Sequence, residues 1–296
     1  MSKIIRRGVA APVAVLLAGA SLSTLAFAAD ESLAVAPKGA ATWTILSAGG
    51  KHGEEQAWTD KKGVRHARMK MVLRGLTYDI DHATTVNDKG LPTSIVIKGV
   101  TPSGDAGETF SVEDGVAKWK SPVDAGEAEW RDDLAYVSFG GPVDTSAMLV
   151  AALLADDNQR LDALPGGSIK ISELTKLTVT AGGKSKALTA MAIDGASFEP
   201  VVVWLDDKRA FFGTAGGLSW LPKGWDDVRQ QLIDAETTAL AARAPAVRAA
   251  LVKDPGAPVL FKNVKIYDAA TNGFKQKQSV LVEGATIKAV GKKAKA

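Results

Sequence analysis

Short stretches in which apolar and polar residues alternate place the strongest constraint on this chain. In residues 64–73, Ala67, Met69 and Met71 alternate with mostly polar neighbours, and residues 78–86 repeat the pattern. Successive side chains of a β-strand point to opposite faces, so alternation with a period of two is typical of a strand that is buried on one side. We therefore expect strands with one apolar and one polar face.

Turn sequences separate these strands. Residues 60–63 (Asp-Lys-Lys-Gly) and 87–90 (Asn-Asp-Lys-Gly) each end in a glycine, which can adopt the positive φ that tight turns require. Further short β-forming runs follow at 94–99, 110–112, 116–120, 135–139, 169–171, 174–180, 187–193, 201–205 and 209–214. Evenly spaced short strands indicate an antiparallel meander. The sequence predicts a mainly β (α+β) fold, built as a twisted antiparallel sheet or half-barrel.

Two segments carry a helical pattern instead. Near residues 145–157, apolar residues from Met148 to Leu153 form one stripe, and Asp144 or Thr145 is expected to cap the first turn. A second helix is expected near residues 225–252. We expect both helices to cover the sheet.

The second helix has distinct signals at its start and in its interior. Asp226 and Asp227 lie in the expected first turn, where their negative charge meets the positive end of the helix dipole. Pro245 is expected to break or kink the helix, because proline lacks the backbone N–H. The Lys-Asp-Pro-Gly sequence at 253–256 marks a domain boundary, so residues 42–253 are expected to form one β-domain.

The first 28 residues have the features of an export signal. Lys3, Arg6 and Arg7 precede an uncharged apolar stretch from Gly8 to Leu25, and Ala-Phe-Ala at 26–28 fits a cleavage site. An uncleaved membrane anchor is the alternative, but the apolar stretch is barely long enough to span a bilayer. We expect cleavage after residue 28, a flexible lead-in over 29–41, and a periplasmic or secreted mature protein with no membrane attachment.

Composition excludes some classes of partner and of chemistry. Removal of the signal takes away three basic residues, which leaves 33 basic and 33 acidic residues. No basic stripe with interleaved aromatic residues is present, so we expect no nucleic-acid partner. The chain has no cysteine, which excludes a disulfide and a cysteine nucleophile. Packing alone must therefore stabilise the fold outside the cytoplasm.

The histidines do not form a known metal motif. The chain has three, His52, His66 and His82, with neither an H-x-H nor an H-E-x-x-H pattern. We expect His66 on the polar face of its strand, and His52 in a hairpin. His82 shares a face with apolar residues, so it is either a hydrogen-bonded core residue or part of a pocket lining. A metal between His66 and His82 is the less favoured alternative.

Other catalytic patterns are equally weak. No G-x-S-x-G elbow is present. The acidic pairs Asp79/Asp81, Asp132/Asp133 and Asp156/Asp157 are most simply solvated strand faces and loop ends. From the sequence we name no catalytic, cofactor-binding or metal-binding residue.

Tryptophan is the more suggestive residue type. Seven tryptophans are spread over the β region, and each indole contributes a large apolar area together with an N–H that needs a partner when buried. Core packing is the default interpretation. The alternative is a curved sheet with aromatic side chains on its concave face, closed by a helix, which would bind a hydrophobic ligand.

The last forty residues carry a family resemblance. "VLFKNVKIYD" (259–268) and "SVLVEGATIKAVG" (279–291) resemble the first strands of the β-sandwich in metal-dependent amidohydrolases of the imidazolonepropionase-like type. Residues 258–291 are thus expected to be an incomplete sandwich segment. With "DGVAKWKS" (114–121) and "PVVVWLDDKRAFFG" (200–213), residues 42–251 look like the accessory region of some exported members.

The resemblance implies hydrolysis of carbon–nitrogen bonds, with dipeptides as a plausible substrate class. In the complete family, zinc held in a catalytic barrel activates water. No residue here matches those ligands, so we expect an N-terminal fragment, truncated before the barrel, that binds no cofactor and is inactive alone. A separately encoded barrel chain is the expected partner. The rival expectation is a periplasmic binding module for a hydrophobic ligand or a partner chain.

Overall fold

The computed structural model describes residues 32–253 and 255–295. The expected export signal, residues 1–28, and the start of the lead-in lie outside the described residues. Within the described part, no helix has the length and apolar character needed to cross a membrane.

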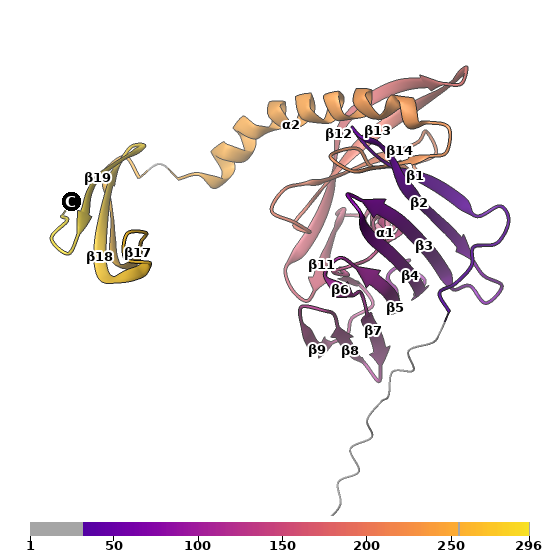
Figure 1. Cartoon of the computed structure of the whole chain (residues 1–296), viewed down its shortest axis with the longest axis horizontal. Helices are drawn as coiled ribbons and strands as arrows, with labels where there is room; N and C mark the ends of the chain where they lie inside the picture. The colour runs from indigo at the N-terminus through magenta and orange to yellow at the C-terminus, as the bar shows by residue number, and fades with distance from the viewer. Residues whose placement is uncertain (1–31, 254, 296) are drawn as a thin grey trace, which may run out of the picture.

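The larger of the two main sheets is antiparallel and, within the described residues, ten-stranded. Its order is β16-β1-β2-β3-β4-β5-β7-β8-β9, with β6 paired to β5. Figure 1 shows this sheet curling around α1. Its strands are β1 (Ala41–Ser47), β2 (Gly50–Thr59), β3 (Arg65–Leu73), β4 (Leu76–Val86), β5 (Pro92–Thr101), β6 (Gly104–Asp105), β7 (Glu108–Glu113), β8 (Val116–Lys120), β9 (Ala125–Glu129) and β16 (Ser219–Pro222).

The expected alternation explains this sheet. Ala67, Met69 and Met71 of β3 are buried on its concave side, and Ile80 of β4 lies opposite Met69 in the register. The turns at 60–63 and 87–90 join successive strands, and Gly63 and Gly90 have positive φ as expected. The predicted mainly β fold with an antiparallel half-barrel is therefore confirmed.

The second main sheet has the order β10-β11-β12-β13-β14-β15 within the described residues. Only its β10–β11 pair is parallel. The sequence suggested two strands at 169–171 and 174–180, but β12 is continuous, with an irregular register between Glu173 and Thr175. The strands are β10 (Leu134–Tyr136), β11 (Arg160–Leu164), β12 (Ser168–Ala181), β13 (Lys184–Asp194), β14 (Val201–Leu205) and β15 (Phe211–Gly213).

The two expected helices are present in the described chain. α1 (Val143–Ala155) packs Val150 and Leu153 against the second sheet. α2 (Arg229–Leu251) follows a short 3-10 turn, η1 (Asp226–Val228). Of the two expected effects of Pro245, a break does not occur, because α2 continues to Leu251.

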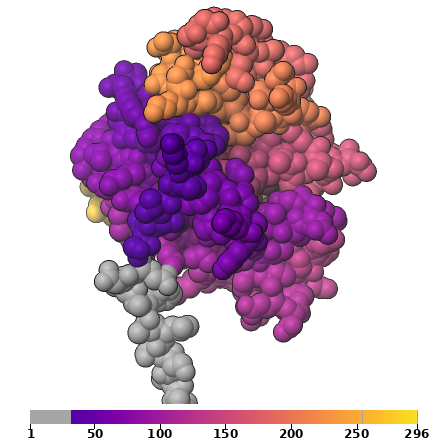
Figure 2. All heavy atoms as spheres, turned by 90° about the vertical axis from the view of Figure 1, so that its right-hand side faces the viewer, coloured from indigo at the N-terminus to yellow at the C-terminus, as the bar shows by residue number. Residues whose placement is uncertain are grey.

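α2 joins the two main sheets at one end. Val228 and Leu232 pack with Leu46 and Leu221 of the larger sheet and with Trp204 of β14. The indole N–H of Trp204 donates a hydrogen bond of 2.5 Å to Glu236. Burial raises the pKa of the Glu236 carboxyl to about 7, against the opposing effect of that hydrogen bond. Figure 2 shows the orange residues of α2 lying over the upper end of the indigo and purple strands.

A third, antiparallel sheet follows α2 and consists of β17 (Val259–Asp268), β18 (Gly273–Glu283) and β19 (Thr286–Gly291). In Figure 1 it stands apart from the two main sheets, beyond the end of α2. None of residues 259–291 is buried. The three strands lie within residues 258–291, and the sheet has no interior of its own.

Candidate functional site

A largely apolar hollow lies between α1 and the concave side of the larger sheet. It has a volume of about 490 Å³, within the range of roughly 300–1,000 Å³ typical of small-molecule sites. We call it the α1 cavity. Strands β3 and β4 supply Met69, Met71, Tyr78 and Ile80 to its wall.

The opposite wall of the α1 cavity comes from α1 and the second sheet. Val143, Met148 and Leu149 of α1 line it together with Ile193 of β13 and Val201 of β14. No charged side chain is among the described residues that line it. Methionine side chains are flexible and polarisable, so a wall rich in them can adapt to ligands of different shape. The arrangement is suited to holding an apolar molecule.

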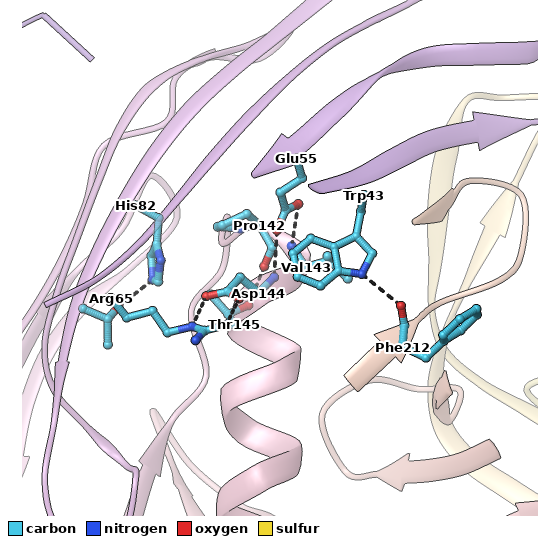
Figure 3. A network of polar contacts seen from close by, with 10 residues as sticks. Trp43, Glu55, Arg65, His82, Pro142, Val143, Asp144, Thr145 and Phe212 are labelled. Carbon is cyan, nitrogen blue, oxygen red and sulfur yellow. Dashed lines mark hydrogen bonds and ion pairs between the residues drawn. The ribbon is translucent and has the colours of Figure 1, made fainter. Parts of the chain in front are cut away.

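A buried carboxylate holds the first turn of α1. Glu55 of β2 is fully buried, and its two oxygens accept hydrogen bonds from the backbone N–H groups of Val143 (3.1 Å) and Asp144 (2.9 Å) (Figure 3). The first N–H groups of a helix have no partner within the helix, and the helix dipole favours a negative charge there. Glu55 therefore caps α1 from a strand that lies almost ninety residues earlier in the chain.

The sequence-based prediction of this cap was wrong. Neither Asp144 nor Thr145 caps α1, because Pro142 occupies the N-cap position and makes no side-chain hydrogen bond. Asp144 is instead buried and ion-paired with Arg65 of β3, whose Nε and Nη2 donate hydrogen bonds of 2.6 and 2.5 Å. This bonding raises the pKa of the Arg65 guanidinium. Figure 3 shows both side chains beside the start of α1.

Burial dominates the electrostatics of Glu55. It raises the pKa of the carboxyl to about 8, and the negative charge of Asp144 acts in the same direction. The two backbone N–H groups and the nearby indole of Trp220 act in the opposite direction. The Trp220 N–H is close enough to influence Glu55, yet it lacks a well-formed hydrogen bond among the described residues.

A second buried carboxylate fixes the segment before α1. Glu108 of β7 accepts hydrogen bonds from the Tyr136 hydroxyl (2.8 Å) and from the backbone N–H groups of Phe139 and Gly140 (both 3.0 Å). Burial and the bond to Glu108 raise the pKa of Tyr136. Tyr136 and Gly140 also line the α1 cavity. Two strands of the larger sheet thus position the helix that closes this cavity.

Of the seven tryptophans, Trp220 lines the α1 cavity. Trp43 and Trp204 are buried, and Trp43 donates a hydrogen bond of 2.9 Å to the carbonyl oxygen of Phe212 (Figure 3). Trp130 packs beside Phe110. Core packing therefore accounts for most of the indoles, and one belongs to the wall of the cavity.

The histidines lie apart from the α1 cavity. His82 is buried and bonded to the Thr84 hydroxyl at 2.7 Å, so it is a core residue, and burial lowers its pKa to about 4. His66 is half-buried, stacked on Trp58 and 3.2 Å from Asp60, rather than freely solvated. Because Ala67, not His66, is the register partner of His82, the two imidazoles point to opposite faces of the sheet.

No constellation for metal or nucleophilic chemistry stands out in the described residues. They contain no group of three or more side chains suited to hold a metal. The zinc that the amidohydrolase resemblance implies for the complete family therefore has no ligand set among them, and we derive no step through it. His52 lies 2.6 Å from the Ser47 hydroxyl in the β1–β2 hairpin. Among the described residues, no hydrogen bond joins the His52 imidazole to an acidic side chain, which is the usual third group of a nucleophilic triad.

These features define a mainly β protein with a curled antiparallel sheet, two helices and an apolar cavity under one of them. No family model matches the chain, and no curated protein sequence does. A solved structure of a DUF1089 family protein from Pseudomonas aeruginosa is similar at 13% identity, covering 63% of this chain and 97% of that chain, with a TM-score of 0.33. A similarity at this level carries no argument about function.

Proposed function

We propose that this protein binds a hydrophobic small molecule in the α1 cavity. The observation that carries the proposal is the cavity itself, a hollow of about 490 Å³ with an apolar wall and no charged side chain among the described residues that line it. Sites of this kind bury most of a ligand's surface, and the hydrophobic effect supplies the driving force. The buried carboxylates of Glu55 and Glu108 support this function because they fix the helix that forms one wall.

We also propose that binding takes place outside the cytoplasm, in the periplasm or after secretion. This part rests on the sequence of residues 1–28 alone.

Binding of an apolar fluorescent dye tests the proposal. We expect the purified chain to bind about one dye per molecule, and native mass spectrometry to detect a co-purified apolar ligand. Met148→Trp places a larger side chain in the α1 cavity and should weaken dye binding at least tenfold. Val72→Trp is the matched control, because Val72 is exposed on the outer side of β3. Equal dye binding by the two variants would contradict the proposal.

A second candidate function follows from the third sheet. Phe261, Val280 and Val290 are cross-strand neighbours, and Phe261, Ile287 and Val290 are more than half exposed. Exposed apolar side chains on an uncovered sheet are typical of an interaction surface. Together with the resemblance of residues 258–291, this supports the proposal that the sheet joins a separate amidohydrolase barrel chain, which would supply the zinc.

Reconstitution tests this second candidate. The chain alone should not hydrolyse dipeptides, and addition of a barrel chain with zinc should produce activity. Phe261→Lys should prevent that gain, whereas Val72→Lys, on a different sheet, should not. Zinc-dependent hydrolysis by the purified chain alone would contradict the proposal that the barrel supplies the active site.

A further inference from the structure

The α1 cavity combines an apolar wall with a few uncharged polar groups. The hydroxyls of Ser138 and Ser146 are on lining residues, as is the phenol of Tyr78. The hydroxyls of Thr101 and Thr145 are on lining residues too, but they donate to the carbonyl oxygens of Gly104 and Pro142. Hydroxyl groups both donate and accept hydrogen bonds. They match a ligand head group that carries hydroxyl, ester or ether oxygens.

The positive groups near the α1 cavity are already neutralised by this chain. The start of a helix attracts anions, but the N–H groups of Val143 and Asp144 are taken by Glu55. The guanidinium of Arg65 is held by Asp144.

The backbone N–H groups of the segment that leads into α1 are also occupied by a carboxylate of this chain. The N–H groups of Phe139 and Gly140 both donate to Glu108. Glu55 and Glu108 thus occupy the backbone N–H groups at the start of α1 and just before it, and no cationic side chain is among the described lining residues.

This arrangement disfavours a charged ligand. An anionic head group inside the cavity would lose its hydration and find no free counter-charge among the described lining residues, and an unpaired buried charge is costly. A cationic head group would lose its hydration as well. It would find no free carboxylate as a partner, because Glu55 and Glu108 are buried and already accept hydrogen bonds.

We infer that the α1 cavity selects neutral amphiphiles, meaning an acyl or similar apolar body with an uncharged oxygen-bearing head, and rejects the carboxylate of equal chain length. This inference rests on the proposed binding function. The volume sets the size of the ligand: at roughly 30 Å³ for a water-sized group, about 16 such groups fit. A chain of about ten to twelve carbons with a small head has this size.

Competition with the bound fluorescent dye tests the inference at pH 7.5, below the micellar concentration of each competitor. We expect dodecan-1-ol and monodecanoylglycerol to displace the dye at concentrations at least tenfold lower than dodecanoate or dodecyltrimethylammonium. Displacement by dodecanoate at the same or lower concentration overturns the charge selection while leaving hydrophobic binding intact. Failure of the dye to bind overturns the proposed function and the inference with it.

A variant separates charge selection from chain solubility. Ser146→Lys adds an ammonium group at a partly exposed lining position and should improve displacement by dodecanoate at least fivefold, with little change for dodecan-1-ol. Val72→Lys adds the same charge on the outer side of β3 and should change neither. Cooperative urea unfolding of both variants verifies that they fold. An unchanged preference in folded Ser146→Lys contradicts the inference.

Discussion

Replacement of Glu55 by glutamine tests the electrostatic account of the α1 cap. Glu55 is fully buried, and its pKa is raised from 4.5 to about 8, chiefly by burial. Between these two values the folded chain binds one proton that the unfolded chain does not. The free energy of unfolding then falls as pH rises, by about 1.4 kcal/mol per pH unit for one proton. Glu55 therefore stabilises the fold fully below pH 4.5, and this contribution is lost as pH rises to about 8.

Glutamine has nearly the same shape and does not titrate. From pH 5 to pH 8, the free energy of unfolding of wild type should fall by about 3.5 kcal/mol relative to Glu55→Gln. At every pH the free energy of unfolding of the variant should also be lower by about 1–3 kcal/mol, because its amide NH₂ faces one backbone N–H donor. Urea unfolding followed by tryptophan fluorescence at pH 5, 6, 7 and 8 measures this difference.

Two comparisons make the measurement specific. Glu236→Gln should show the same direction of change but level off near pH 7, since burial raises the pKa of Glu236 to about 7. Glu129→Gln, on an exposed position of β9, reports the effect of the chemical change alone. Parallel stability curves for wild type and Glu55→Gln from pH 5 to pH 8 would refute the reasoning and indicate that the helix start keeps Glu55 ionised.

Three further variants test packing around the two helices. Arg65→Met leaves the buried Asp144 unpaired and should cost about 3–5 kcal/mol in urea unfolding, part of which the added change Asp144→Asn should restore. Leu232→Ala removes a fully buried anchor of α2 and should cost about 2–5 kcal/mol by the same assay. Gly53→Ala should lower the melting temperature by several degrees, because its Cβ would lie 2.0 Å from the carbonyl oxygen of Lys70; an unchanged value would exclude that clash.

Local pattern in the sequence predicts the elements of this fold well. Alternation in 64–73 and 78–86 predicts β3 and β4, because a strand buried on one face needs apolar residues at every second position. The helical stripe from Met148 to Leu153 predicts α1 for the same kind of reason. The pairing of β1 with β16 is not predictable in this way, since its partners are more than 170 residues apart.

The candidate site was much harder to predict. Glu55 is a charged residue at an inward position of β2, next but one to the buried Ala57, and that inward placement is the one signal in the sequence. The sequence favoured Asp144 or Thr145 as the cap because local capping is common. The sequence alone cannot show that Glu55, a residue of β2, accepts the hydrogen bonds of the first N–H groups of α1. The α1 cavity likewise draws its wall from elements that only the tertiary fold brings together.

The far half of α2 has a consequence for how the molecule is put together. Leu232 and Glu236 are buried, whereas residues 244–251 are all exposed, and a helix rises about 1.5 Å per residue. The last two turns therefore act as a spacer of about 12 Å that carries the final sheet without packing against it. The two main sheets should therefore unfold independently of the final sheet, so damage to the final sheet should leave their calorimetric peak in place.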